Sequence, residues 1–103
     1  MDTKQIATTI LKQLGGNKFI AMTGARRFVA LENGGIIFHL PSNFAVKGIN
    51  IVKIELDPSD TYNITFYKAH RGIIKEIDNY EMIYCDQLQG IFTKVTGLYT
   101  SLY

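Results

Sequence analysis

The sequence lacks tryptophan. It has one cysteine and two histidines, so it is also poor in the residues that most often bind metals or form disulfides. A single cysteine, Cys85, cannot form an intramolecular disulfide, and we therefore expect a reducing, cytoplasmic setting. His39 and His70 do not have the spacing of a metal-binding motif with Cys85 or with the carboxylates. The sequence therefore predicts no metal site and no cofactor.

Long apolar runs are also missing. No stretch approaches the roughly 18 consecutive apolar residues needed to span a bilayer. The opening residues, Met1-Asp2-Thr3-Lys4, do not begin an apolar segment of the kind found in signal peptides. We therefore expect no membrane partner and no secretion.

The overall composition is typical of a globular protein. Hydrophobic residues make up 47% of the chain and charged residues 19%, which is too apolar for a disordered tail. A length of 103 residues suffices for one modest core. We predict a single domain over residues 1–103, because no linker, repeat or low-complexity segment divides the chain.

The most regular stretch is Ile49–Lys68, which predicts a β-hairpin. Apolar residues alternate with polar ones in each half, as the period of two in a half-buried strand requires. The two halves flank Asp57-Pro58-Ser59-Asp60, where Pro58 presets φ and Asp57 can accept a backbone hydrogen bond. The faces predicted to be buried carry Val52, Ile54, Leu56, Tyr62, Ile64 and Phe66.

A second hairpin is expected between Arg27–Glu32 and Ile36–Leu40. These runs flank Asn33-Gly34-Gly35, and Asn-Gly between two strand-like runs favours a type I′ turn with two positive φ angles. Two further segments are candidate strands: Asn17–Thr23, despite its poor alternation, and Ile73–Ile77, whose charges suit an edge.

Helices are predicted at both ends of the chain. Thr3–Leu14 carries an apolar stripe, with Asp2 or Thr3 as N-cap and Gly15 as C-terminal glycine. Asp78 and Glu81 resemble a capping box ahead of a second helix that ends near Gly97. The stripe of that helix is Tyr84, Leu88, Ile91, Val95 and Leu98, broadened by Cys85 and Phe92. A short helical turn is also expected over residues 43–47.

These elements predict an α+β fold. Sequential strands joined by tight turns favour an antiparallel meander of four or five strands, with the N-terminal and C-terminal helices packed on it.

The sequence does not predict an enzyme. Cys85 is flanked by Glu81 and Asp86, which disfavour a reactive thiolate. Gly15-Gly16-Asn17-Lys18 follows the C-terminus of the first predicted helix, where the helix dipole is negative, and lacks the Gly-Lys-Ser/Thr ending of a phosphate-binding loop.

The charges are distributed unevenly. The chain carries a net charge of +2, yet residues 76–103 hold only Lys94 against four carboxylates. Most cations therefore lie in the predicted sheet, where basic and aromatic side chains together favour binding to single-stranded nucleic acid. The candidates are Lys18, Arg26, Arg27, Tyr67, Lys68 and Arg71, with Tyr62 near them in sequence.

The C-terminal tail is a candidate protein interface. Leu98, Tyr99, Leu102 and Tyr103 follow the predicted helix stop, and a cluster of large apolar side chains marks an interaction site. We expect the tail to fold back on its own chain or to pack on another subunit.

The sequence resembles small uncharacterised proteins of bacteriophages and integrated mobile elements. The likeness lies in Gly16–Ala25, Ile91–Leu98, Leu40-Pro41 and Asp60-Thr61-Tyr62. It implies a cytoplasmic accessory protein without implying any functional residue.

Two functions follow as hypotheses. The first is a non-enzymatic interaction module that binds an unknown protein partner or itself. The alternative is a small nucleic-acid-binding protein that uses the basic residues and tyrosines of the sheet.

Overall fold

The computed structural model describes residues 2–42 and 44–100 and contains three helices, five strands and two short 3₁₀ turns. In chain order these are α1 Thr3–Leu14, α2 Asn17–Thr23, β1 Arg26–Leu31, β2 Gly35–His39, η1 Val46–Gly48, β3 Ile51–Leu56, β4 Tyr62–His70, β5 Ile73–Ile83, η2 Cys85–Gln87 and α3 Leu88–Thr96.

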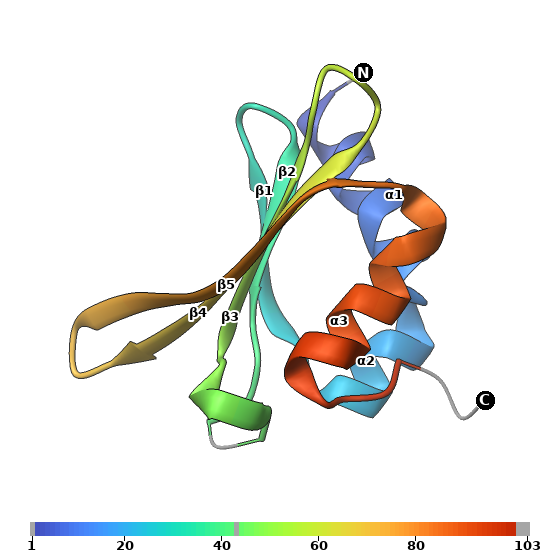
Figure 1. Cartoon of the computed structure of the whole chain (residues 1–103). Coiled ribbons are helices and arrows are strands. Elements are labelled where there is room, and N and C mark those ends of the chain that lie inside the picture. The colour runs from blue at the N-terminus through green and yellow to red at the C-terminus, as the bar shows by residue number, and fades with distance from the viewer. Residues whose placement is uncertain (1, 43, 101–103) are drawn as a thin grey trace.

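The strands form one antiparallel sheet in the order β1-β2-β3-β4-β5, so each strand pairs with its neighbour in sequence. Figure 1 shows the three helices gathered on one face of this sheet, while the other face is left open. The predicted α+β meander with terminal helices is therefore confirmed, with five strands.

The core lies between the helices and the covered face of the sheet. Val52 and Ile54 of β3 and Ile64 and Phe66 of β4 are fully buried, as the alternation predicts. The aromatic ring of Phe19 meets the rings of Phe38 and Phe92 edge-on, with centroids 5.5 Å and 5.1 Å apart. Such pairs add to the stabilisation that comes from burial alone.

Residues 17–23 form helix α2, so their prediction as a strand is wrong. The alternation of apolar and polar residues is weak because the segment is a helix. Phe19 and Thr23, four residues apart, lie on its buried side. The Thr23 hydroxyl donates to the Phe19 carbonyl and accepts from the Ala25 amide. Gly24, with φ 71°, then ends the helix in the left-handed conformation.

Strand β5 runs to Ile83, so the predicted helix start at Asp78 and Glu81 is also wrong. Pairing with β4 is irregular at two places, between Phe66 and Tyr67 and between Tyr62 and Ile64. Each irregularity inserts an extra residue and shifts the alternation. The apolar residues Ile77, Tyr80 and Ile83 consequently recur every third position, which imitates a helix.

The last helix begins ten residues later than Asp78, at Leu88, after a 3₁₀ turn. The Tyr84 amide donates to Gln87 Oε1 and the Gln87 amide donates to the Tyr84 carbonyl, which caps this turn. Cys85 is exposed here instead of belonging to the core, and Tyr84 is exposed as well. Gly97 ends the helix with φ 76°, as predicted.

The type I′ turn lies at a different place from the predicted one. In the loop after Leu31, Gly34 has φ 95° while Asn33 does not have a positive φ, and the Gly34 amide donates to the Leu31 carbonyl. This is a three-residue loop with a glycine bulge. Two consecutive positive φ angles occur instead at Arg71 (51°) and Gly72 (81°), which join β4 to β5. Of the helical turn expected over residues 43–47, residues 46 and 47 lie in the short η1, and residue 43 lies outside the described residues.

Candidate nucleic-acid interface

The strand register places cations at one end of the sheet. Arg26 pairs with His39, His39 with Ile51, and Ile51 with Tyr67, so these residues form one row across four strands. At strand spacings of 4.7–4.9 Å, this row spans about 14 Å. We call this end of the sheet the basic end, and its exposed cations are Arg26, Arg27, Lys47, Lys68, Arg71 and Lys75.

The opposite end of the sheet is acidic. Glu32 follows β1, Glu55 lies near the end of β3, and Asp57 and Asp60 form the β3–β4 turn. Asp57 Oδ2 accepts from both the amide and the hydroxyl of Ser59, and these hydrogen bonds lower the pKa of Asp57. The charges are thus separated along the strand direction, with three exceptions. Glu76 and Asp78 lie opposite Tyr67 and Phe66, and Lys53 is 3.5 Å from Glu55.

The arginines of β1 lie in an irregular part of the strand. The pairing with β2 shifts between Arg26 and Val29, and Arg27 adopts φ 57°. An irregularity of this kind redirects a side chain relative to regular pairing. Burial, followed by the charges of Arg27 and Arg26, lowers the pKa of His39. Both guanidinium groups therefore contribute to the positive potential around His39.

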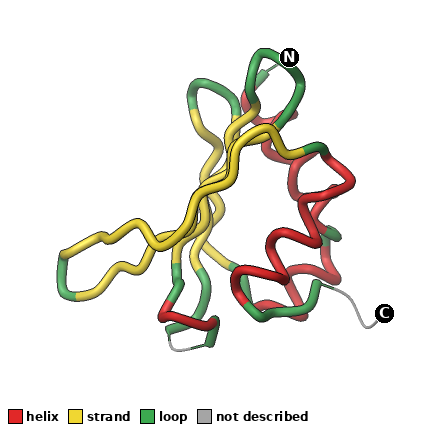
Figure 2. Tube along the Cα trace, viewed as in Figure 1, coloured by secondary structure: helices red, strands yellow, loops and turns green. Residues whose placement is uncertain are grey.

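The end of the β4–β5 hairpin extends beyond the sheet, and we call residues 68–75 the arm. Strand β3 pairs with β4 only as far as Tyr67, whereas β4 and β5 stay paired through Lys68–Lys75, Ala69–Ile74 and His70–Ile73. Figures 1 and 2 show this hairpin projecting away from the helices. His70 is the last residue of β4.

Asn50 fixes the base of the arm. Its carboxamide nitrogen donates to the Ala69 carbonyl at 2.9 Å, and its carboxamide oxygen accepts from the Ala69 amide at 2.8 Å. The Asn50 backbone amide also donates to the Tyr67 carbonyl. One side chain thus replaces the missing β3 partner of Ala69. These hydrogen bonds therefore fix the direction in which the arm leaves the sheet.

Tyr62 and Tyr67 do not form a shared platform for base stacking. Tyr62 is 5% exposed on the helix-covered face, as the alternation of the strand predicts, so it cannot join Tyr67 in a binding surface. Tyr67 lies on the open face, but Lys53 Nζ is 5.8 Å from the centre of its ring. The interaction with Tyr67 raises the pKa of Lys53 against the effect of burial, and Glu55, 3.5 Å away, adds to the rise.

The predicted cations separate into two groups. Arg26, Arg27, Lys68 and Arg71 belong to the basic end, whereas Lys18 is exposed on α2, in the helical layer. The turn η1, which contains Lys47, adjoins Lys68, because a Cβ at Gly48 would lie 3.1 Å from the Lys68 side chain. Sequence reasoning did not include Lys47 or Lys75, although the hairpin pairing of Lys75 with Lys68 would have indicated the latter. Asn50 had no recognisable sequence signal.

The residues of the predicted protein interface in the C-terminal tail differ in their exposure. Leu98 is half-buried and packs against the core, and Tyr99 is 69% exposed. Thr100 is buried, and its hydroxyl donates to Gln89 Oε1 at 3.2 Å. The tail therefore folds back on its own chain as far as Thr100, while Leu102 and Tyr103 lie outside the described residues.

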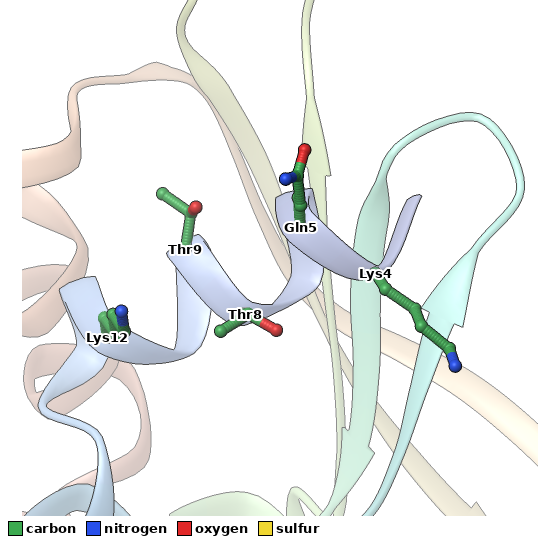
Figure 3. Close-up of a pocket in the computed structure, with 5 residues that line it drawn as sticks. All are labelled: Lys4, Gln5, Thr8, Thr9 and Lys12. Atoms are coloured by element: carbon green, nitrogen blue, oxygen red, sulfur yellow. The ribbon is translucent and has the colours of Figure 1, made fainter. Parts of the chain in front are cut away.

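One hollow of the described surface lies along the exposed side of α1 and has no converging side chains. Figure 3 shows its lining residues Lys4, Gln5, Thr8, Thr9 and Lys12 coming from that helix alone and pointing in different directions. Within residues 2–42 and 44–100, no three His, Cys, Asp or Glu side chains are grouped to hold a metal ion.

No protein-family model, curated protein or solved structure matches this chain. The resemblance to proteins of bacteriophages and mobile elements therefore stays a prediction, as does the cytoplasmic location. None of the helices in the described part of the chain has the length and hydrophobicity required to cross a bilayer.

Proposed function

We propose that this protein is a non-enzymatic nucleic-acid-binding protein whose binding surface is the basic end of the sheet. The observation that supports the proposal most strongly is the separation of charge along the strands. Cations from β1, η1, β4 and β5 gather at one end, while Glu32, Glu55, Asp57 and Asp60 lie at the other. A positive surface on a chain of small net charge attracts a polyanion and orients it.

The net charge of +2 is an ordinary value and does not by itself favour a polyanionic partner. The arrangement of the charges matters more, since several exposed cations at one end of the sheet can bind successive phosphates along one strand. Exposed side chains also reach a partner without unfolding of the chain. The proposal therefore predicts affinity that depends steeply on salt.

The test is a titration of nucleic acid with the protein at several salt concentrations. The double variant Arg26→Gln/Arg27→Gln removes two charges and keeps most of the side-chain volume. It should reduce the slope of log affinity against log salt by roughly one for each phosphate that is no longer neutralised. Absence of binding to any nucleic acid at low salt would refute the proposal.

Protein binding or self-association is the second candidate, and it is supported by the outer edge of β5. This strand is 11 residues long and lies at the edge of the sheet, with Met82 66% exposed. An unpaired edge can add a strand from another chain. The irregular pairing and the charges of Glu76 and Glu81 oppose this, and we therefore rank it second. Sedimentation at increasing protein concentration tests it, and a monomer throughout would exclude self-association.

A further inference from the structure

We propose that the arm, residues 68–75, enters a groove of double-stranded DNA. This inference rests on the nucleic-acid binding proposed above and specifies which form of nucleic acid is bound and which element binds it. Four features support it: the shape of the arm, its charges, its exposed apolar side chains and the lack of an aromatic platform on the open face.

The arm has the dimensions of a groove-binding ribbon. Beyond Tyr67 it consists of two strands alone, closed by the turn at Arg71 and Gly72. Three residue pairs at about 3.4 Å per residue extend it roughly 10 Å beyond the sheet. The major groove of B-form DNA, about 12 Å wide and 8.5 Å deep, admits a two-stranded ribbon. The hydrogen bonds of Asn50 to Ala69 hold the ribbon in place before binding.

The charges of the arm favour an anionic partner. Lys68 and Lys75 are directly opposite each other in the ladder, and Arg71 lies at the tip. Like charges directly opposite each other destabilise a strand pair. Phosphates on both sides of the arm would relieve this repulsion, and no acidic residue lies between positions 68 and 75. Glu76, the next residue, pairs with Tyr67 at the base of the arm.

Two isoleucines on the arm are unusually exposed. Ile73 is 71% exposed and Ile74 64%, although they are adjacent residues on a strand. Since neighbouring strand residues point to opposite faces, Ile73 shares one face of the ribbon with Lys68 and Lys75, whereas Ile74 shares the other face with Ala69. Such side chains can pack against thymine methyl groups or wedge between base pairs. Cations together with exposed apolar side chains next to the tip therefore suit insertion into a groove better than binding to a flat surface of phosphates.

Single-stranded nucleic acid is the less suitable ligand. Proteins that bind it stack successive bases on several aromatic side chains. On the open face, the five strands present one aromatic residue, Tyr67, whose ring is approached by Lys53. Phe28, Phe38, Tyr62 and Phe66 belong to the covered face or its core. Duplex RNA fits poorly for another reason, because its major groove is too deep and narrow for side chains to read.

The experiment compares binding of the full chain to a DNA duplex, to each of its single strands, to an RNA duplex of the same sequence and to anionic lipid vesicles. The variant Lys68→Ala/Lys75→Ala removes the opposed cations, and Lys4→Ala/Lys12→Ala on α1 is the control with the same change in charge. We expect the DNA duplex to bind most tightly. The arm variant should lower the salt slope by about two, whereas the control should leave it unchanged.

A third variant, Ile73→Ser/Ile74→Ser, keeps the charges and tests insertion. It should weaken duplex binding about ten-fold, because a loss of that size corresponds to one good interaction in the groove. The slope of log affinity against log salt should not change. Circular dichroism and the urea midpoint check that each variant is folded.

The outcomes separate the two proposals. If nucleic acid binds and Arg26→Gln/Arg27→Gln weakens it, but the arm variants match the Lys4/Lys12 control, the arm inference is wrong and the basic end remains the interface. Tighter binding to single strands than to the duplex would also overturn the arm inference. Binding to vesicles without binding to any nucleic acid would overturn both.

Discussion

Asn50 provides the sharpest test of how the arm is held. Replacing it with alanine removes two hydrogen bonds to Ala69, of 2.9 Å and 2.8 Å, and leaves the backbone hydrogen bond from residue 50 to Tyr67. A typical protein hydrogen bond contributes about 1 kcal/mol net. Because Ala69 is half-buried, water can partly replace the two hydrogen bonds, so we expect a destabilisation of about 1–2 kcal/mol.

The assay combines urea unfolding with amide hydrogen exchange of the native protein. Asn50→Ala should lower the urea midpoint and selectively increase exchange at Ala69 and its neighbours in the arm, since local opening becomes easier there. Asn79→Ala is the matched control, because Asn79 is an exposed strand residue and the described residues form no hydrogen bond with its side chain. Equal midpoints for the two variants, together with unchanged protection of Ala69, would refute the role assigned to Asn50.

Three further predictions concern the fold. Ile54→Ala and Leu88→Ala should each lower the free energy of unfolding by about 2–5 kcal/mol, because both side chains are fully buried; urea midpoints near wild type would contradict the core assignment. Gly34→Val should destabilise the β1–β2 loop, since φ is 95° and the new Cβ would lie 3.1 Å from the Ile6 side chain; an unchanged melting temperature would show that the loop differs. Cys85 should react with a thiol reagent without denaturant, and labelling only after unfolding would place it in the core.

The fold could be predicted where local patterns and tertiary contacts agree. The β3–β4 hairpin has clean alternation, and its Pro58 turn forms with the Asp57 hydrogen bonds expected of it. Prediction failed where bulges changed the period. In β5 the extra residues gave Ile77, Tyr80 and Ile83 a spacing of three, and only pairing with β4 distinguishes this from a helix.

Turn chemistry was equally ambiguous. Asn33-Gly34 is the stronger type I′ signal in sequence, yet that conformation occurs at Arg71-Gly72. Both sequences place glycine at a position of positive φ, and the number of residues between paired strands decides the loop type. That number depends on register, which a local pattern does not specify.

The candidate site could be predicted only in part. The individual cations Arg26, Arg27, Lys68 and Arg71 were found from composition, but their common position at one sheet end follows from the register of four strands. A platform of two tyrosines does not form, because Tyr62 lies on the buried face, as the alternation of its strand already predicted. The projection of the arm depends on where β3 stops pairing, which no residue of the arm itself encodes.

The most direct measurement of the central claim is chemical-shift mapping of the isotopically labelled protein with a short DNA duplex. We expect the largest changes to fall on Arg26, Arg27, Lys47 and residues 68–75, and the pKa of His39 to rise as phosphates offset the arginine charges. Largest changes at Met82 and Tyr84 on the β5 side, or at Lys4 and Lys12 on α1, with the basic end unaffected, would contradict this claim.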